Sequence, residues 1–450
     1  MSVVIQVIGT NHKHMPLADR ERFASSAESN LSVLERTRAT LGAKECAILR
    51  TCNRVEIYSV TAAGHCPKEA VRALFSEACE APDLSLADSV YHYSGEDATT
   101  HLFRVASGLD SMILGEHEVL GQVKSALNEA LESGHAGPIL TRLFNHAIRV
   151  GKRARRETAI SSGIFSVGQC AARLAQEVLG ELRAKRLLVF GAGRIAKVTA
   201  KHMAALGAGP ITVFSRTRER AQCLAAMLEA EAVTAENLPE VLQTSDILVG
   251  CASAPHHVVK AAEIHEATKN RDGRPLVVID LGVPRNVDPE VGKLPGVRLF
   301  NLDDLEYVVA ENIEAREAEI QRVNAIVAEE AADFQSREAQ AEAALVIAKL
   351  RAKVEQIRLE CLARADRKQL SDEDLAFVDY LTDLLVRKLL HKATVALREH
   401  PCGEQADDVD LAAAVTRLFD LDSANGSENP GDCAEEQSAV SLALNKVSGG

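Results

Sequence analysis

A cysteine in a polar turn could act as a nucleophile in this chain. Cys52 follows Thr51 and precedes Asn53 and Arg54, between two apolar runs. The thiolate is the reactive form of cysteine, and a nearby cation on a partly exposed loop favours it. The alternative is that Cys52 is a small buried hydrophobic residue, as free cysteines often are. The alternation around it predicts two strands within 47–59, joined at the cysteine.

A second element with chemistry is a glycine-rich loop that directly follows the apolar run 187–190. In a strand, loop and helix arrangement, the first glycine permits a tight turn and the second lets backbone amides approach a pyrophosphate. A small third residue lets the helix pack on the strand. We therefore expect a dinucleotide site formed by Gly191, Ala192, Gly193, Arg194, Ile195 and Ala196.

The end of the next predicted strand, 211–214, distinguishes between the two nicotinamide cofactors. An NAD site usually places an acidic residue there, against the ribose 2′-hydroxyl. This chain instead has Ser215, Arg216, Thr217 and Arg218, whose cations and hydroxyls suit a 2′-phosphate. The loop therefore predicts NADPH as the cofactor. The alternative, a solvated basic loop, applies to Arg218 more than to Arg216.

A thiol nucleophile and a hydride donor in one chain predict reduction through a covalent thioester. His101 is a candidate assistant, because a neutral imidazole can polarise a carbonyl or accept a proton near neutral pH. A structural histidine is the alternative reading of His101. Thr51, Asn53 and Arg54 are expected to gather on one face with His12 and His101.

The elements that must position these residues fall into three domains and a tail, an α/β multidomain fold. Residues 1–156 mix short strands and helices, including 98–106 and 119–131, and predict an α+β catalytic domain. Residues 157–303 alternate strands with helices and predict a Rossmann-type NADP domain. Residues 304–402 predict long helices, since glycine and proline are absent from 297 to 400. The acidic tail 403–450 is expected to be disordered, apart from a short helix near 411–418.

An apolar stripe at helical spacing marks the start of the long-helix domain, which we expect to be one unbroken helix from 304 to 334. Such a helix needs a second surface to cover its stripe, so we expect a homodimer and a dimerisation role. An intramolecular three-helix bundle is the alternative. The stripe consists of Val309, Ile313, Ile320, Val323, Val327, Ala331 and Phe334.

A basic run near the end of the first domain could form one positive helix face that neutralises phosphates. A solvated helix face is an equal alternative. The run consists of Arg142, Arg149, Lys152, Arg153, Arg155 and Arg156.

Composition limits the remaining function classes. The 450 residues carry a net charge of −13, no Trp and 4% aromatics, so general nucleic-acid or membrane binding is not implied. The ten cysteines form no CxxC pair, so no metal site is expected. The start of the chain does not read as a signal peptide, and no apolar run reaches membrane-spanning length. We expect a cytoplasmic protein with reduced thiols.

Three segments closely resemble the glutamyl-tRNA reductase family, namely 51–58, 101–121 and 9–13, and the resemblance extends from residue 5 to about 400. It implies NADPH-dependent reduction of glutamyl-tRNA(Glu) to glutamate-1-semialdehyde, with release of tRNA through a thioester on Cys52. This is the first step of the five-carbon route to tetrapyrroles. It also implies a V-shaped homodimer and a glutamate-1-semialdehyde aminomutase as partner, because the aldehyde is unstable.

The same resemblance assigns roles to residues. His101 would polarise the carbonyl or assist proton transfer, and Arg54 would pair with the side-chain carboxylate of the substrate. The residues that would line the glutamate pocket are Thr51, Asn53, Ser111, Glu116, His117, Glu118 and Gln122.

Three positions depart from the family pattern. Glu118 places a carboxylate where a neutral amide is common, Arg194 replaces a common glutamate, and Lys392 replaces a frequent proline. Two alternatives therefore stay open: another NADP-dependent oxidoreductase that shares only the dinucleotide domain, and a non-catalytic tRNA-binding or regulatory homologue. The sequence does not predict how the cysteine approaches the nicotinamide, although a hinge near 303–308 or 156–162 is expected.

Overall fold

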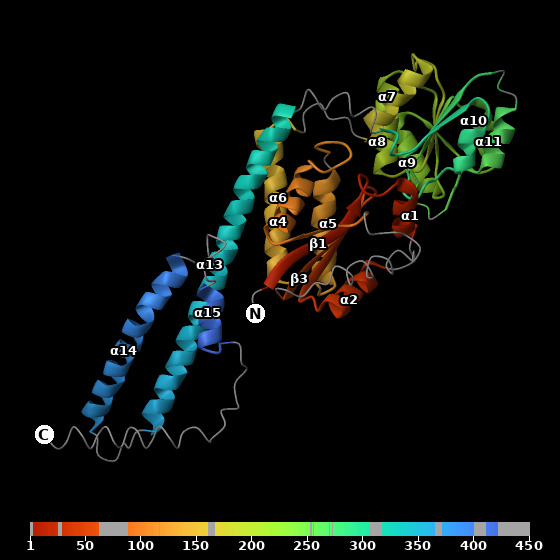
Figure 1. Cartoon of the computed structure of the whole chain (residues 1–450). Helices are drawn as coiled ribbons and strands as arrows, with labels where there is room; N and C mark the ends of the chain where they lie inside the picture. The colour runs from red at the N-terminus through yellow and green to blue at the C-terminus, as the bar shows by residue number, and fades with distance from the viewer. Residues whose placement is uncertain are drawn as a thin grey trace. The chain divides into compact units, whose positions relative to one another are not determined.

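The computed structural model describes residues 3–25, 29–62, 89–116, 118–160, 167–252, 254, 256–269, 271, 273–305, 317–364, 371–399 and 411–421. The chain divides into two compact units after Gln335, and each is described by itself (Figure 1). Of the predicted residues, Val309, Ile313, His117 and most of the acidic tail lie outside the described ranges.

An antiparallel sheet with strand order β2-β3-β1-β4 organises the first domain. The predicted pair of strands around Cys52 is confirmed as β2 and β3, and the predicted first strand as β1. The strands are β1 (Val3–Asn11), β2 (Glu45–Arg50), β3 (Arg54–Ala62) and β4 (Tyr91–Ser94).

Helices cover both faces of this sheet because its apolar residues alternate between them. On one face, Tyr58 packs with Phe103 and Phe144 against α4 (Glu96–Ser107), α5 (Glu118–Glu132) and α6 (Pro138–Glu157). On the other, Ile8 and Ile48 pack against α2 (Asn30–Leu41), which follows α1 (Leu17–Ser25). The predicted helices 98–106 and 119–131 correspond to α4 and α5.

A parallel six-stranded sheet forms the second domain, with strand order β10-β9-β8-β5-β6-β7. Its first strand β5 is central and the order reverses beside it, which is the doubly wound arrangement of dinucleotide-binding domains. The predicted Rossmann-type fold is thus confirmed. Its elements are α7 (Val167–Leu179), β5 (Leu187–Phe190), α8 (Arg194–Ala205), β6 (Ile211–Phe214), α9 (Arg218–Leu228), β7 (Glu231–Val233), α10 (Leu238–Thr244), β8 (Ile247–Gly250), α11 (Ala261–Thr268), β9 (Leu276–Asp280), the 3₁₀ helix η1 (Pro289–Lys293) and β10 (Val297–Phe300).

The long helix α13 (Glu317–Arg364) begins inside the first unit, where it packs along α4 and α6. Val323, Val327 and Phe334 are buried in the same core as Phe103 and Phe144. The prediction that this stripe needs a partner chain is therefore wrong for its described part, because the catalytic domain covers it. The predicted start at 304 lies next to a turn at residues 302–304, and residues 306–316 of the predicted helix lie outside the described ranges.

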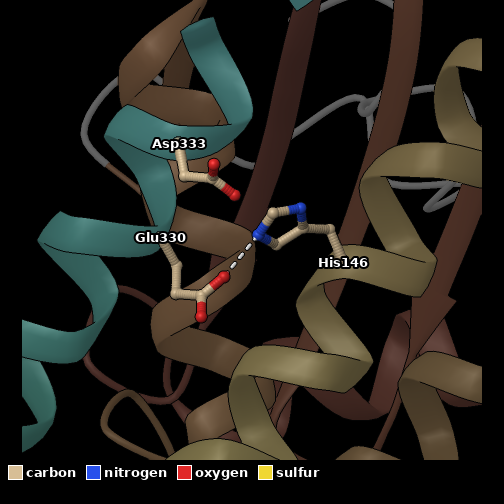
Figure 2. Close-up of side chains that lie close together, drawn as sticks. All are labelled: His146, Glu330 and Asp333. Carbon is tan, nitrogen blue, oxygen red and sulfur yellow. Dashed lines mark hydrogen bonds and ion pairs between the residues drawn. The ribbon is translucent and has the colours of Figure 1, made fainter. Parts of the chain in front are cut away.

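Polar contacts hold α13 to α6 as well. His146 Nε2 lies 2.7 Å from Glu330 Oε2, as Figure 2 shows, and Arg153 bonds to Glu330 at 2.9 Å and to Glu329 at 2.8 Å. With Asp333 the pair has the ligand types of a metal site. However, Arg153 already neutralises Glu330, so we assign the cluster to helix docking.

Part of the basic run on α6 is paired within the protein. Arg153 pairs with three carboxylates, Arg156 pairs with Glu157 at 2.8 Å, and Arg155 turns inward to the carbonyl of Glu116. The acidic residues on α6 and α13 therefore cancel much of the charge that the run carries.

The second unit contains the rest of α13, together with α14 (Asp372–Glu399) and α15 (Leu411–Leu418). Ile347, Leu350, Leu397 and Val415 form its small core, and α15 confirms the predicted short helix. Within the described residues, no helix is long and apolar enough to cross a membrane. Large apolar side chains of α14 are exposed, namely Phe377, Tyr380, Leu381, Leu385 and Leu389.

Replacing Phe334 by Ala should destabilise the first unit by about 3–5 kcal/mol, because a buried ring leaves a cavity. The ring lies 6.0 Å from that of Phe103 and 5.3 Å from that of His146. Urea unfolding followed by circular dichroism measures the change. Gln321→Ala, on the exposed face of α13, is the matched control and should change stability by less than about 0.5 kcal/mol. Equal stability of both variants would show that α13 does not belong to this core.

Candidate active site

Cys52 lies at the tip of the hairpin between β2 and β3. The Thr51 amide donates to the Arg54 carbonyl at 2.9 Å, and the Thr51 hydroxyl accepts from the amides of Asn53 and Arg54 at 3.1 Å each. These hydrogen bonds end the β2–β3 backbone pairing in a tight turn. Thr51 therefore holds the turn that presents Cys52, whereas its expected place in a substrate pocket has no contact to support it among the described residues.

A fully buried carboxylate, Glu56, lies two residues beyond the turn and accepts four hydrogen bonds. The donors are Arg54 Nη1 at 2.7 Å, the hydroxyls of Tyr58 and Tyr91 at 2.6 Å each, and His101 Nε2 at 2.8 Å. Burial opposes the ionisation of Glu56, but His101 and Arg54 outweigh it and hold its pKa below its usual range. Because the ionised Glu56 can only accept, His101 donates from Nε2.

The β1–β3 register explains why this carboxylate fits. Gly9 of β1 lies directly opposite Glu56. A Cβ at Gly9 would lie 2.6 Å from Glu56 Cγ and 2.8 Å from the carbonyl oxygen of Val55. Only glycine leaves room for the Glu56 side chain at this position, so the site depends on both strands.

Arg54 is 2% exposed and already has partners within the protein. Besides Glu56, its Nη1 bonds to Asp110 Oδ2 at 3.1 Å and its Nη2 bonds to the Asp110 carbonyl. Lys13 Nζ lies 2.8 Å from Asp110 Oδ1 on the outer side. The Arg54 guanidinium, the group expected to bind a substrate carboxylate, is therefore occupied by Asp110 in this arrangement.

The expected gathering of polar residues around the turn is confirmed in part. The His12 amide donates to the Asn53 carbonyl at 2.9 Å, and Arg54 connects through Glu56 to His101. Burial, together with the charges of Arg54 and Lys13, lowers the pKa of His12 to about 4. His12 is therefore neutral near pH 7.

The electrostatic surroundings of Cys52 are acidic. Burial, together with the carboxylates of Glu116 and Glu118, raises the pKa of the Cys52 thiol to about 12 against the opposing charge of Arg20. Cys52 also packs against the apolar core of the dinucleotide domain, together with Met112. In this arrangement the thiol is protonated near neutral pH, so its activation requires a change in these surroundings.

Glu116 is itself perturbed. Burial and the neighbouring Glu118 raise the pKa of Glu116 to about 7, with a smaller opposing effect from the Ser111 hydroxyl. Arg155 Nη2 donates to the Glu116 carbonyl at 3.0 Å and fixes this loop. Glu116 thus acts on the thiol, and Ser111 acts on Glu116.

Glu118 and Gln122 lie instead along a polar cavity of about 330 Å³, which Arg50 and Arg194 also line. Arg194 Nε lies 3.2 Å from Glu118 Oε1. The two residues that depart from the family pattern therefore pair with each other. The residues expected in one glutamate pocket fall into two groups, one around Glu56 and one around Glu118.

The predicted glycine loop joins β5 to α8. Gly191 has φ of 116°, and a Cβ there would lie 2.7 Å from the Cys251 carbonyl oxygen. Gly193 caps α8, and no described heavy atom lies within 4 Å of where its Cβ would be. The start of α8 at Gly193 therefore has room beside it, and a helix N-terminus favours an anion such as a pyrophosphate.

The cleft beside this loop has a volume of about 140 Å³ and includes the predicted Ser215, Arg216 and Thr217. Arg218 is not among its lining residues, and Arg220, two residues further along α9, takes that place. Ile195 lies beyond the lining too, and Ala196 is fully buried in the helix packing that its small size permits. The lining residues are Phe190, Gly191, Ala192, Gly193, Phe214, Ser215, Arg216, Thr217, Arg220, Cys251, Ala252 and Val258.

A Rossmann-type domain beside a cysteine-bearing α+β domain defines the class, a nicotinamide-dependent oxidoreductase. Residues 8–158 match the glutamyl-tRNAGlu reductase N-terminal domain, residues 173–308 match shikimate / quinate 5-dehydrogenase, and residues 322–421 match the glutamyl-tRNAGlu reductase dimerisation domain.

Whole-chain relatives agree with these matches. The chain is 37% identical over 422 residues to glutamyl-tRNA reductase of Syntrophus aciditrophicus, covering 93% of this chain and 99% of that one. It is 36% identical over 434 residues to that of Syntrophotalea carbinolica, covering 96% and 97%. The solved glutamyl-tRNA reductase of Methanopyrus kandleri matches with 32% identity and a TM-score of 0.52, covering 93% and 99%. The chain belongs to the glutamyl-tRNA reductase family, so an oxidoreductase that shares only the dinucleotide domain is excluded.

Several residues of the site escaped the sequence reasoning. Glu56 carried a signal, a lone carboxylate inside an otherwise apolar strand, and Asp110 lay within a quoted segment. The sequence around Arg20 and Arg220 carried no signal of a role, because the groups that surround them belong to other elements. Their roles follow only from tertiary contacts.

Replacing Glu116 by Gln should lower the pKa of the Cys52 thiol, because it removes a negative charge that disfavours the thiolate. The pH midpoint of iodoacetamide alkylation at Cys52, read by mass spectrometry, should move downward by about one unit. Glu132→Gln, at the exposed end of α5, is the control and should leave the midpoint in place. An upward shift for Glu116→Gln would contradict the acidic surroundings described for the thiol.

Proposed function

We propose that this protein is an NADPH-dependent glutamyl-tRNA reductase that converts glutamyl-tRNA(Glu) to glutamate-1-semialdehyde and releases tRNA, the first step of tetrapyrrole (porphyrin and haem) biosynthesis. The observation that carries the proposal is the packing of Cys52 against the core of the dinucleotide domain. A thioester reductase requires its nucleophile and its hydride donor to meet, and this packing supports the proposal that they do.

Cys52 is the nucleophile of the proposed reaction. Its thiolate attacks the ester carbonyl of glutamyl-tRNA, the carbon–sulfur bond forms, and the carbon–oxygen bond to the tRNA ribose breaks as the ribose hydroxyl leaves with a proton. Bound NADPH would supply the hydride for the thioester carbon, whereupon the carbon–sulfur bond breaks and Cys52 returns as a thiolate with release of the aldehyde.

His101 is proposed to orient and polarise the carbonyl. Its Nε2 donates to Glu56, which fixes the orientation of the ring, so Nδ1 is the nitrogen left to act on the carbonyl. Glu56 and the tyrosines hold the imidazole in place, so the ring needs little reorganisation when substrate binds.

Arg54 is proposed to hold the side-chain carboxylate of the substrate, which would take the place of Asp110. Asp110 suits such an exchange better than Glu56 does, because its side chain is 14% exposed and that of Glu56 is 0% exposed. Asn53, Ser111 and Glu116 complete the proposed glutamate site near the thiol, and the bidentate guanidinium provides its specificity.

Three further assignments belong to the proposal. Ser215, Arg216 and Thr217 favour NADPH, since they present cations and hydroxyls to the cleft. A homodimer is supported by the match of residues 322–421 to a dimerisation domain and by the exposed apolar residues of α14. A cytoplasmic location and a glutamate-1-semialdehyde aminomutase partner, which would consume the unstable aldehyde, complete the picture.

Incubation with glutamyl-tRNA in the absence of NADPH should leave a glutamyl adduct on Cys52, because the acyl transfer needs no hydride. Intact-protein and peptide mass spectrometry locate the adduct. Cys52→Ser should abolish the adduct and the reductase activity together, while Cys223→Ser, at an exposed position on α9, should retain both. Absence of an adduct on the unaltered protein would favour the non-catalytic homologue.

Arg216 and Arg218 form a matched pair for testing cofactor choice. Arg216→Ala should raise KM for NADPH by about 10-fold or more, since one charge-assisted contact to the 2′-phosphate is lost, and should leave KM for NADH nearly unchanged. Arg218→Ala should have little effect on either, because Arg218 does not line the cleft. Initial-rate kinetics with both cofactors make the comparison, and equal effects of the two substitutions would contradict the assignment.

A further inference from the structure

Two consecutive residues of α1, Arg20 and Glu21, connect the catalytic domain to the dinucleotide domain. Arg20 is 4% exposed, and each of its three nitrogens has a partner. Its Nε donates to the Met15 carbonyl at 3.0 Å, its Nη1 donates to the Cys52 carbonyl at 2.9 Å, and its Nη2 pairs with Asp303. One guanidinium thus joins the nucleophile's own backbone to the chain segment after β10.

Glu21 makes the second contact, with Arg285. Its carboxylate accepts from Arg285 Nε at 2.8 and 2.9 Å, from Nη2 at 2.7 Å, and from the Arg285 backbone amide at 2.5 Å. The side chains are 12% and 25% exposed. A fork-to-fork pair with an added backbone bond fixes orientation as well as distance.

Both contact points lie beyond the carboxyl ends of parallel strands. Asp303 follows β10, and Arg285 belongs to the loop after β9. Asp280 anchors that loop by accepting from the amides of Gly282 at 3.0 Å and Val287 at 2.8 Å. In a doubly wound sheet, ligands bind along this edge. The helix α1 therefore contacts the dinucleotide domain at the edge of the sheet where ligands bind.

The two pairs have opposite polarity, which makes the contact specific. The catalytic domain contributes a cation followed by an anion, and the dinucleotide domain presents Asp303 and Arg285 in the complementary order. A shift of α1 along this edge would place like charges together, so the arrangement defines one register between the domains.

We propose that Arg20 and Glu21 form an interdomain clamp that holds the Cys52 turn against the edge of the dinucleotide cleft. They are positioning residues: Arg20 acts through the Cys52 backbone, and Glu21 acts through the loop after β9. The clamp shields the thiol and sets its position for the hydride step, but the attack on the ester does not require it. This inference rests on the proposed function only for its second consequence, the rate of reduction.

Charge reversal separates the clamp from ordinary structural support. Glu21→Arg and Arg285→Glu should each raise the rate of iodoacetamide alkylation at Cys52, measured without cofactor, by about 10-fold, because the shielding domain is released. Each should also reduce reductase turnover by about 10- to 100-fold while the glutamyl adduct on Cys52 forms as before. The double variant should restore both properties, since the pair re-forms with exchanged charges.

Two more variants keep the test decisive. Asp303→Asn removes one carboxylate charge while leaving the bonds of Arg20 to Met15 and Cys52 possible, and it should act in the same direction. Glu290→Arg reverses an exposed charge whose partner Lys293 lies in the same domain at 2.6 Å, and it should change neither readout.

Single variants that match the unaltered protein in alkylation rate, or a double variant no better than the singles, would overturn the clamp. Failure of the proposed function would look different. The unaltered protein would then form no glutamyl adduct, while the alkylation rates would still report whether the clamp exists.

Discussion

The buried carboxylate of Glu56 is the interaction on which the catalytic domain depends. An ionised carboxylate at 0% exposure costs several kcal/mol to desolvate unless its oxygens are satisfied. Four donors from β3, β4 and α4 satisfy it. The requirement for ionisation thereby fixes the rotamers of Arg54 and His101, and Gly9 provides the space. The same hydrogen bonds that allow Glu56 to be buried therefore also hold the side chains of the site in place before substrate binds.

The charges around the Cys52 thiol disfavour its ionised form, in contrast to those around Glu56. Glu56 is surrounded by groups that stabilise its charge, whereas Cys52 faces Glu116 and Glu118, and the nearby Arg20 bonds to its carbonyl. The protein thus keeps His101 oriented at all times and keeps Cys52 neutral until the surroundings change. A neutral, half-buried thiol is also less prone to oxidation, because oxidation attacks the thiolate.

Local patterns predicted the parts of this structure that neighbouring residues determine. The strands around Cys52, the glycine loop at Gly191 and the parallel sheet follow from alternation and turn chemistry. Partners distant in sequence could not be predicted in this way. Phe334 belongs to the core of the first domain, Arg54 is occupied by Asp110, and Arg220 replaces Arg218 because α9 turns that residue away. Each error concerns a side chain whose partner is set by tertiary structure.

Glu118 and Arg194 show the same limit at the level of the family. Considered singly, each departure is unfavourable: a carboxylate near an anionic substrate, and an arginine where the family commonly has glutamate. In the structure they meet at 3.2 Å, so each removes the uncompensated charge of the other. Their side chains are 32% and 68% exposed, which makes the pair worth little to stability. The pairing still leaves Glu118 among the carboxylates that raise the pKa of the Cys52 thiol, so it reduces the negative charge near the thiol without abolishing it.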